Sequence, residues 1–337
     1  MIDFILPWVD GSDKEWQKIK SIYEKKKIDM RFRDLGTLKY VLRSIEKFAP
    51  WYNKIHLITE GHYPEWLNIN HEKINLVTHD KLFFDSSDLP TFNSRAIEMN
   101  LANIKGTSNQ IVYLNDDTLL YNHVTEERFF KNGVPVDFFS HGWFLRGKLY
   151  ESIRGPNNWV NAINNNLTLI NKTFIPHELS NDALYHPSYN LTNKISNFMF
   201  NNVYKKIFWL EHWHHPRSLL LSNIKECYNE YESEIRQTSK NRFRCNEDLN
   251  PYIYRYWHLV KNDFYPYKHH DGYVCRITKF TDLEDGFKYL ANDEMKNNFA
   301  CLNDSMSTVS DEEFKRTKAL AIEELDSIFP DKAKFEI

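Results

Sequence analysis

Residues 110–121, QIVYLNDDTLLY, place two adjacent carboxylates at the end of an apolar run. Strand-forming residues 111–114 lead directly into Asn115, Asp116 and Asp117, and apolar residues then resume. This pattern is typical of a buried strand that delivers acids to its carboxyl end, where ligands of open α/β sheets bind. Adjacent carboxylates repel each other and lose hydration there, so the pattern predicts a cation or a cationic side chain against them. The alternative is an acidic turn whose residues serve only turn geometry.

Strands and helices alternate along the first part of the chain. Short apolar runs bounded by polar residues predict strands, and apolar positions that repeat on one helical face predict helices between them. This alternation predicts a Rossmann-like α/β fold with a mainly parallel sheet. The predicted strands are residues 3–9, 54–59, 73–78 and 111–114, and the predicted helices are residues 14–27, 37–48 and 93–104.

The pattern loosens between about residue 134 and about residue 210, where the sequence is rich in aromatic residues and Asn. We interpret this stretch as a helical, aromatic-rich insertion that shapes one side of the binding cleft. Three parts are therefore predicted: an α/β core over residues 1–133, the insertion over residues 134–210, and a part over residues 211–337 that completes the core. Further predicted elements are helices at residues 158–170, 191–204, 222–235, 252–257 and 310–329, and a strand at residues 299–302.

The composition excludes some classes of function. The 337 residues carry a formal net charge of −3, which argues against broad binding to nucleic acid or to anionic membranes, because both need a basic surplus. The four cysteines are widely spaced and match no metal-binding pattern, so we expect reduced thiols. The sequence shows neither a secretory leader nor an apolar segment long enough to cross a bilayer, and we therefore expect a cytoplasmic protein.

Two stretches near the N-terminus favour a nucleotide site. Residues 10–13, DGSD, stand between a strand and a helix, which is the usual opening of an α/β nucleotide site. An ordinary turn followed by a helix N-cap is the alternative. Arg31 and Arg33 precede the next helix, where two guanidiniums would grip phosphate oxygens in a planar fork.

Imidazoles and guanidiniums recur in the C-terminal part. Residues 212–216, HWHHP, hold His214 two positions before a proline, so the local chain is expected to be extended and the ring can face a cleft. A surface His cluster is the alternative, and a zinc site is less favoured because no carboxylate or Cys stands at ligand spacing. Arg242 and Arg244 form a second basic loop, at a place where an anion would need clamping.

A second acidic strand end is predicted near the C-terminus. Residues 299–304, FACLND, repeat the central pattern, with Asn303 and Asp304 after a short apolar run. If this strand end meets the first one, the two together would form an oxygen-rich cage for a hard cation such as Mg²⁺.

In this order the motifs resemble the Stealth family of sugar-phosphate transferases, which includes bacterial capsule polymerases and the catalytic part of the animal lysosomal-enzyme GlcNAc-1-phosphotransferase. Two positions depart from the family pattern, because Leu35 stands where Asn is common and no Arg stands near Val160. The resemblance covers about half of the chain in four blocks: residues 2–13 (IDFILPWVDGSD), residues 31–121 (with RFRDLG, LPTFNSRAIE and YLNDD), residues 214–258 (with HHP and NRFRCNEDL) and residues 301–304 (CLND).

The resemblance implies transfer of a sugar 1-phosphate from a UDP-sugar to a hydroxyl of an acceptor glycan, with release of UMP, in the synthesis of capsule or surface polysaccharide. Residues 1–133 would bind the nucleotide sugar, and residues 134–210 would shape the acceptor side. The implied acceptor is an oligosaccharide or a lipid-linked glycan, reached at the inner face of the cell membrane through other capsule-synthesis proteins. The sugar, the linkage, the choice between polymerisation and single addition, and the oligomeric state stay open.

The resemblance also implies a metal site. Asp117 would be a base or a metal ligand, and Asp116, Asn303 and Asp304 would complete the shell around Mg²⁺ or Mn²⁺.

Charge on the transferred phosphate would be stabilised by Arg244 with help from Arg242. His214 would act as an acid, a base or a phosphate donor. The implied substrate contacts are Trp8, Asp10, Gly11, Arg31, Arg33, Asn93 and Asp248.

Two other classes of function are compatible with these residues. An ordinary metal-dependent glycosyltransferase would attack C1 of the sugar and release UDP, so the nucleotide product separates it from a phosphotransferase. A non-catalytic carbohydrate-binding module would need neither a metal nor paired arginines, and turnover abolished by EDTA would exclude it.

Overall fold

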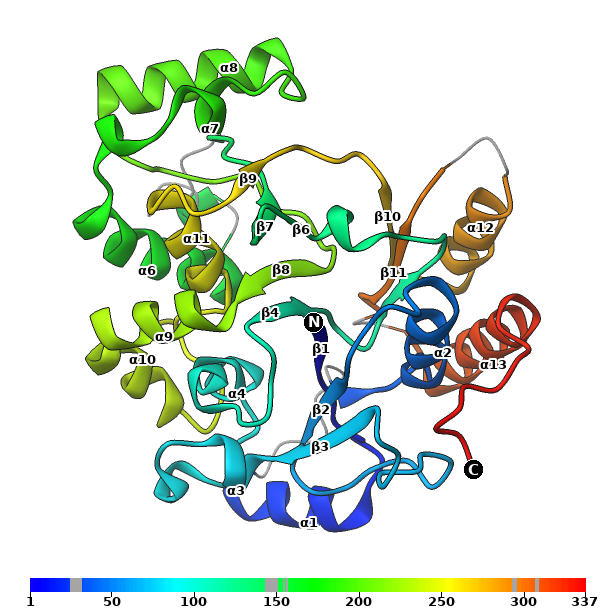
Figure 1. The fold of residues 1–337 in the computed structure, drawn as a ribbon. Helices are drawn as coiled ribbons and strands as arrows, with labels where there is room; N and C mark the ends of the chain where they lie inside the picture. Colours follow the sequence, from blue (N-terminus) through cyan, green and yellow to red (C-terminus); the bar gives the residue numbers. More distant parts are fainter. Residues whose placement is uncertain (25–31, 143–150, 154, 156, 293–295, 307–308) are drawn as a thin grey trace.

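A five-stranded sheet lies at the centre of the molecule, with the strand order β3–β2–β1–β4–β8 (Figure 1). The first four strands in this order are parallel, and β8 is antiparallel to β4. The predicted Rossmann-like α/β fold with a mainly parallel sheet is confirmed. The computed structural model describes residues 1–24, 32–142, 151–153, 155, 157–292, 296–306 and 309–337. The strands are β1 (Ile2–Pro7), β2 (Ile55–Thr59), β3 (Ile74–Thr78), β4 (Gln110–Tyr113) and β8 (Arg217–Leu220).

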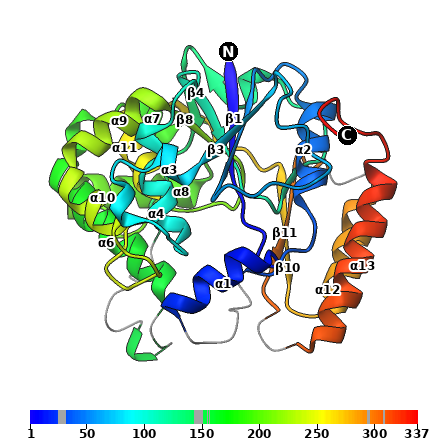
Figure 2. The same cartoon turned by 90° about the horizontal axis from the view of Figure 1, so that it is seen from below.

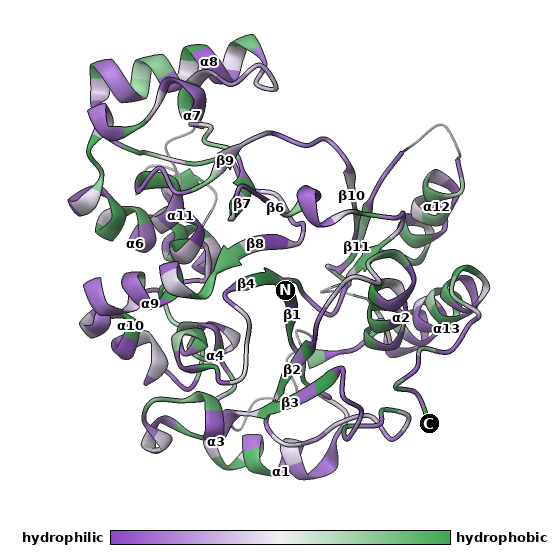
Figure 3. Cartoon of the chain, in the orientation of Figure 1, coloured by the Kyte–Doolittle hydropathy of each residue, from purple (hydrophilic) through white to green (hydrophobic). Residues whose placement is uncertain are grey.

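The central sheet separates two hydrophobic cores. Because side chains alternate along a strand, Phe4 of β1 packs into one core and Ile5 into the other. Figures 1 and 2 show α2, α12 and α13 on one side of the sheet and α4, α6, α9, α10 and α11 on the other. In Figure 3 the central strands are largely green, that is hydrophobic, as expected for strands that are covered on both faces.

The helices that cover the sheet begin and end as follows. On the side of Phe4 they are α2 (Leu38–Phe48), α12 (Phe280–Leu290) and α13 (Asp311–Ile328). On the side of Ile5 they are α4 (Ser94–Met99), α6 (Asn158–Thr173), α9 (Leu221–Glu230), α10 (Glu232–Ser239) and α11 (Tyr252–Val260). The others are α1 (Lys14–Tyr23), α3 (His79–Leu82), α7 (Asn181–Tyr185), α8 (Leu191–Phe198) and the short helical turns η2 (Ser86–Asp88), η3 (Leu101–Asn103), η4 (Glu126–Arg128), η5 (Pro176–Glu178) and η6 (Met199–Tyr204).

A second sheet is joined to the first at the acidic turn. Its strand order is β10–β11–β5, with β10 (Gly272–Ile277), β11 (Phe299–Asp304) and β5 (Thr118–Leu120). Since β5 follows β4 after only residues 114–117, the acid pair lies between the two sheets. A third small sheet has the order β6–β7–β9, with β6 (Phe130–Lys131), β7 (Val134–Asp137) and β9 (Tyr265–Pro266).

The structure corrects several predicted element boundaries. The predicted helix 93–104 is α4 followed by the 3₁₀ turn η3, and the predicted helix 222–235 is the pair α9 and α10, which is broken at the buried Tyr231. Strand β1 ends at Pro7 rather than at residue 9, and the predicted helix 14–27 ends at Tyr23 within the described residues. The elements that were not predicted are strands β5, β6, β7, β8, β9 and β10 and helices α3, α7 and α12. Within the predicted insertion, α6 packs on α11, so the insertion shares a core with the C-terminal part.

The segment 335–337 is part of the packed structure. Phe335 is fully buried, and the carboxylate of Glu336 binds the guanidinium of Arg43 through two hydrogen bonds of 2.7 and 2.8 Å. Its backbone also joins the loop after β2: the Asn68 amide donates to the Phe335 carbonyl, and the Ile337 amide donates to the Trp66 carbonyl. The segment therefore holds the loop around Trp66 in place.

In the part of the chain that the structure describes, no helix combines the length and the apolar character that crossing a membrane requires.

His141 is a buried imidazole in the core beside α6. It stacks on Phe200, and neither of its ring nitrogens has a hydrogen-bond partner among the described residues. Burial lowers the pKa of His141 to about 3. An unfolded His titrates near pH ~6.5, so the unfolded chain gains a proton that the folded chain excludes, and stability is lost as the pH falls below that value.

We expect His141→Phe to lose this acid sensitivity. When the pH falls from about 7 to about 5, the free energy of unfolding of the unaltered chain should drop by about 2 kcal/mol more than that of the variant. The reason is that protonation of the imidazole stabilises the unfolded state of the unaltered chain by that amount. Urea unfolding at both pH values measures the difference, and His177→Gln, at an exposed position, is the control. Equal pH responses of His141→Phe and the unaltered chain would contradict the assignment of a neutral buried imidazole.

Candidate active site

The candidate active site lies where the strand order reverses. From β1 the chain continues to β2 and β3 on one side, and it later returns to form β4 on the other side of β1. The loops after β1 and β4, which contain residues 8–13 and 114–117, therefore leave neighbouring parallel strands in different directions. Such a switch point at the carboxyl ends of the strands is where open α/β sheets bind ligands.

Three carboxylates gather at this point. Burial raises the pKa of Asp116 well above its usual range, and the negative charges of Asp117 and Asp34 raise it further. Among the described residues no cationic side chain forms an ion pair with Asp116. Because like charges in a poorly hydrated place are unfavourable, the arrangement would be stabilised by a cation.

The second acidic strand end meets the first, as the sequence predicts. The backbone amide of Leu302 in β11 donates to the carbonyl of Asp117 over 2.9 Å, and Cys301 pairs with Thr118 across the β11–β5 register. The Thr118 hydroxyl also donates to the Asp117 carboxylate over 3.1 Å. Backbone hydrogen bonds thus join the acidic turn to the C-terminal strand.

His214 completes the cluster. Its Nε2 lies 3.9 Å from Oδ2 of Asp117 and 3.4 Å from the side-chain amide nitrogen of Asn115. Possible ligand atoms of Asp117, His214 and Cys301 all lie within 4.8 Å of one another. The pKa of the Cys301 thiol is raised well above its usual range by burial and also by Asp117, so the thiol stays protonated unless a metal binds it.

Asn303 and Asp304 have other contacts. Asp304 accepts a hydrogen bond from the Met306 amide over 2.8 Å and lies 3.5 Å from the guanidinium of Arg33, and Asn303 accepts one from the Ser305 hydroxyl. The predicted four-residue shell of Asp116, Asp117, Asn303 and Asp304 therefore stays a prediction. The crowded carboxylates of Asp116 and Asp117 fit Mg²⁺ or Mn²⁺ by their chemistry, since hard cations take oxygen ligands.

A pocket of about 460 Å³ opens beside this cluster. Gly11 is required in its wall, because a Cβ there would lie 1.9 Å from the Phe32 carbonyl oxygen. The carboxylate of Asp10 accepts from the amide and the hydroxyl of Ser12, which fixes the loop after β1. Four of the predicted substrate contacts line this pocket, namely Trp8, Asp10, Gly11 and Arg33. Asp34, Trp66 and Phe314 also line it and were not predicted as substrate contacts.

Arg33 connects this pocket to the C-terminal part of the chain. Its guanidinium donates to the Met306 carbonyl over 2.6 Å and lies over the ring of Phe314 at 4.2 Å. These contacts and the ion pair with Asp304 hold the arginine against the pocket wall. The other predicted arginine of this pair, Arg31, lies outside the described residues.

The basic loop of residues 241–248 lies against the start of α4. Arg244 donates to the Ser94 hydroxyl over 2.6 Å. Arg242 donates to the carbonyls of Pro90 and Leu89 and lies over the ring of Tyr23 at 4.2 Å. The guanidinium of Arg242 therefore holds the chain before α4 in place. This placement does not favour the predicted contact of Arg242 with phosphate.

Asn93 and Asp248 are fully buried, and protein groups bind their polar atoms. Asn93 caps α4 and donates to Asp248, and Asp248 also accepts from Asn241 and the Cys245 amide. This placement does not support the predicted direct contact of either residue with substrate. The two side chains instead position the loop that carries Arg244.

Sequence reasoning did not assign Asp34 and Cys301 to the site. Both stand inside motifs that were singled out, RFRDLG and CLND. The only signal for Asp34 was its place beside Arg33 and before a Gly turn, where its carboxylate accepts from the Gly36 amide over 2.6 Å.

Because Asp34, Asp116 and Asp117 lie close together, the affinity of this site for a divalent cation is expected to depend on pH. A proton on Asp116 competes with a cation, so the affinity for Mn²⁺ should fall as the pH drops through the raised pKa of Asp116. Asp34→Asn removes one cause of that raised pKa and keeps an oxygen for the Gly36 amide. The midpoint of the loss should therefore move to lower pH, while binding at high pH weakens because a negative charge is gone.

Electron paramagnetic resonance of free Mn²⁺ measures this binding directly. Asp285→Asn, which removes an exposed carboxylate on α12, should leave the midpoint unchanged. An unchanged midpoint in Asp34→Asn would show that the charge of Asp34 does not act on Asp116.

Comparison with known proteins gives consistent matches. The family model described as Stealth protein CR1, conserved region 1, matches residues 2–28, and that described as Stealth protein CR2, conserved region 2, matches residues 31–137. The chain is 33% identical to capsular polysaccharide phosphotransferase WcwK of Streptococcus pneumoniae, over 99% of this chain and 98% of that protein. It is 31% identical to exopolysaccharide phosphotransferase cps2G of Lactiplantibacillus plantarum, over 99% and 96%, and 30% identical to receptor polysaccharide phosphotransferase WefC of Streptococcus oralis, over 100% and 99%.

Among solved structures, the galactosyltransferase LgtC in complex with donor and acceptor sugar analogs is a distant match. It has a TM-score of 0.38 and 11% identity, over 94% of this chain and 95% of that chain.

Proposed function

This chain belongs to the Stealth family of polysaccharide phosphotransferases, and on that premise we propose that it transfers a sugar 1-phosphate from a UDP-sugar to a hydroxyl of an acceptor glycan. The product would be a phosphodiester in a bacterial capsule or surface polysaccharide, and UMP would be released. The observation that carries this proposal is the convergence of Asp116, Asp117 and His214 at the switch point, beside a pocket of nucleotide size.

The reaction is a displacement at phosphorus. The acceptor oxygen attacks the phosphorus that carries the sugar, and the bond from that phosphorus to the bridging oxygen of the pyrophosphate breaks. UMP leaves with the bridging oxygen. The bond between C1 of the sugar and its oxygen stays intact, so the anomeric configuration is kept. The protein has to position the reactants, offset phosphate charge and remove the proton of the hydroxyl.

Asp117 and His214 are the candidates for moving that proton. The imidazole Nε2 lies 3.9 Å from the carboxylate and is oriented by Asn115. Either group could accept the proton from the acceptor hydroxyl, and the neighbouring group would stabilise the charge that results. Asp116 and Asp117 would hold Mg²⁺ or Mn²⁺, which would supply charge neutralisation at the phosphate oxygens.

Donor binding is proposed for the pocket around Gly11. At Gly11 the backbone of another loop comes too close to allow a side chain, and Asp10 fixes the loop after β1. A glycine that permits such close approach of backbone is also a feature of other α/β nucleotide sites. Arg33, held at the wall by Met306 and Phe314, would face the pyrophosphate. Arg244, placed at the start of α4, would offset charge on the transferred phosphate.

The cellular setting is also a proposal. A nucleotide-sugar donor and four free thiols suit an enzyme that works in the cytoplasm. A lipid-linked acceptor would bring it to the inner face of the membrane, together with other capsule-synthesis proteins.

The nucleotide product tests the reaction type. Incubation of the protein with a panel of UDP-sugars, Mg²⁺ and acceptor glycans should release UMP, whereas a glycosyltransferase would release UDP. Asp117→Asn should lower the rate by about 10²–10³, since one preorganised group that acts on the transition state contributes that much. Asp331→Asn, at an exposed position, should keep full activity. Release of UDP, or full activity in Asp117→Asn, would refute the proposal.

A further inference from the structure

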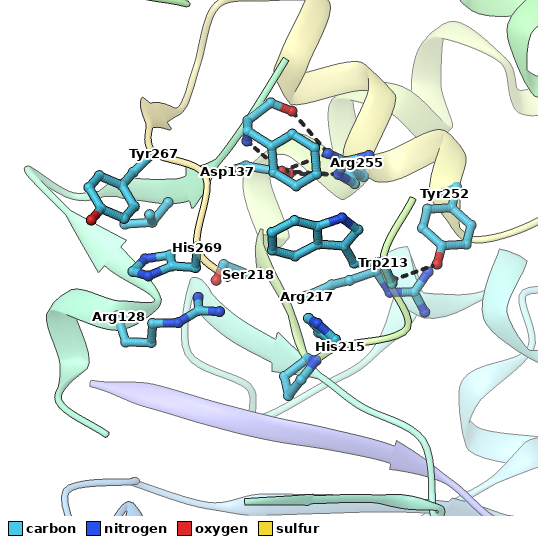
Figure 4. A pocket seen from close by; sticks show the side chains of 13 residues that line it. Arg128, Asp137, Trp213, His215, Arg217, Ser218, Tyr252, Arg255, Tyr267 and His269 are labelled. Carbon is cyan, nitrogen blue, oxygen red and sulfur yellow. Dashed lines mark hydrogen bonds and ion pairs between the residues drawn. The ribbon is translucent and has the colours of Figure 1, made fainter. Parts of the chain in front are cut away.

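A second, smaller pocket lies on the other side of the reaction centre. His215 and Pro216, which follow His214 directly, form part of its wall, and residues of β7 and α11 also line it; Figure 4 shows the lining side chains. The acidic turn after β4 separates it from the pocket around Gly11, because β4 lies between β1 and β8 in the sheet. Its lining consists of Arg128, Val136, Asp137, Phe138, Trp213, His215, Pro216, Arg217, Ser218, Tyr252, Arg255, Tyr267 and His269.

The size of this pocket limits what it can enclose. Its volume is about 50 Å³, which is enough for roughly three or four water molecules. Ligand pockets that enclose a whole small molecule are several times larger, at about 300–1,000 Å³. A single charged or polar group fits, and a sugar ring or a nucleotide does not.

Two of the three guanidiniums in the wall are already paired. Arg128 makes hydrogen bonds of 2.7 and 2.8 Å to the carboxylate of Asp271, and Arg255 binds Asp137 in the same manner. These two arginines therefore add no net charge to the pocket.

The imidazoles of the wall are neutral at physiological pH. Burial lowers the pKa of His269 to about 4 and also lowers the pKa of His215. Neutral rings can still give or accept hydrogen bonds, and Nδ1 of His215 is a buried atom without a partner among the described residues.

Arg217 is the remaining cation. Its guanidinium lies 4.4 Å from the ring centre of Tyr113 and 4.6 Å from that of Tyr252, and Figure 4 shows the side chain reaching toward Tyr252. No carboxylate forms an ion pair with it among the described residues. A guanidinium held by ring faces keeps its N–H groups for a carboxylate or a phosphate group.

The carboxyl group of Glu98 interacts electrostatically with Arg217 without forming an ion pair among the described residues. It is buried behind Tyr113, whose hydroxyl donates to it. Burial raises the pKa of Glu98, whereas Arg217, Arg244 and Arg95 each lower it. One carboxyl that is shared among three guanidiniums does not neutralise Arg217.

We propose that the pocket around Arg217 binds an anionic group of the acceptor glycan, a phosphodiester or a carboxylate one unit away from the attacking hydroxyl. Arg217 lies opposite Tyr113 in the β4–β8 register, and Asn115, two residues after Tyr113, contacts His214 over 3.4 Å. This places Arg217 next to the strand end that carries the proposed reaction centre. The inference rests on the proposed function, because it needs an acceptor glycan at the reaction centre.

The two sources of this anion have different consequences. A phosphodiester in the acceptor is what the proposed reaction itself produces, so its recognition would suit an enzyme that extends its own product. A carboxylate would instead belong to an acidic sugar that another transferase had added. The guanidinium of Arg217 can form paired hydrogen bonds with either group.

Three acceptors separate these cases. They are one synthetic oligosaccharide with a phosphodiester next to its terminal sugar, the same sugars joined by a glycosidic bond, and the same chain with a hexuronic acid at that place. The ratio kcat/KM for UMP release with each acceptor is measured for the unaltered protein. An anionic acceptor should be preferred to the neutral one by about tenfold to a hundredfold, the range for a charge-assisted hydrogen bond. The anionic acceptor with the higher ratio identifies the source.

Variants then test Arg217 itself. Arg217→Gln should lower kcat/KM for the anionic acceptor to the level of the neutral one, mainly through KM, and leave the neutral acceptor unchanged. Arg217→Lys should keep part of the preference, since the charge remains and the planar fork is lost. Arg236→Gln, which removes a half-exposed guanidinium on α10, is the matched control and should keep the full preference.

The outcomes distinguish this inference from the proposed function. Equal kcat/KM for the neutral and both anionic acceptors in the unaltered protein would overturn the inference even if Arg217→Gln does not fold, and UMP release would still support the proposed function. Release of UDP would refute the proposed function, while a preference for the anionic acceptor that Arg217→Gln abolishes would still place the anion at Arg217.

Discussion

Carboxylates at the end of a buried strand are unfavourable unless other charges offset them, and the site is arranged around this constraint. Asp116 and Asp117 cannot move away, because β4 and β5 fix the turn from both sides. Asp34 adds a third negative charge from a different part of the chain. The imidazole of His214 lies 3.9 Å from the carboxylate of Asp117, and Arg33 pairs with Asp304. A divalent cation, as proposed for this site, would offset the remaining charge.

The same turn joins the two larger sheets of the molecule. The hydrogen bond from the Leu302 amide to the Asp117 carbonyl continues the ladder of β11 into the turn. Any shift of β11 would therefore move the backbone of a proposed catalytic residue. The core on that side is filled by α2, α12 and α13, so distant packing also determines where the carboxylate lies. The geometry of the site depends in this way on residues at both ends of the sequence.

The sequence predicts four of the five strands of the central sheet, because these four are short apolar runs that can be recognised without their distant partners. The fifth strand, β8, was not predicted. It predicts the meeting of the two acidic strand ends for a similar reason, since each carries its acids in its own motif. Strand β10 was missed, because only Cys275 and Ile277 of its six residues are buried, so no continuous apolar run marks it. Asn93 and Asp248 were assigned to substrate, yet they are buried and bonded to protein groups. A sequence does not show whether a polar side chain will form its hydrogen bonds within the protein, because its partners lie in loops that are far apart in the chain. The placement of Asp34 beside Asp116, and of Arg217 between Tyr113 and Tyr252, depends on tertiary contacts in the same way.

The packing of residues 335–337 has a consequence for biogenesis. The Trp66 carbonyl accepts from the Ile337 amide, and Trp66 lines the pocket proposed for the donor. The carboxylate that holds Arg43 on α2 also comes from this segment. During translation the N-terminal half leaves the ribosome first, and the loop around Trp66 lacks its hydrogen bonds to residues 335–337 until these residues have emerged. The wall of the proposed donor pocket at Trp66 is therefore completed late in synthesis.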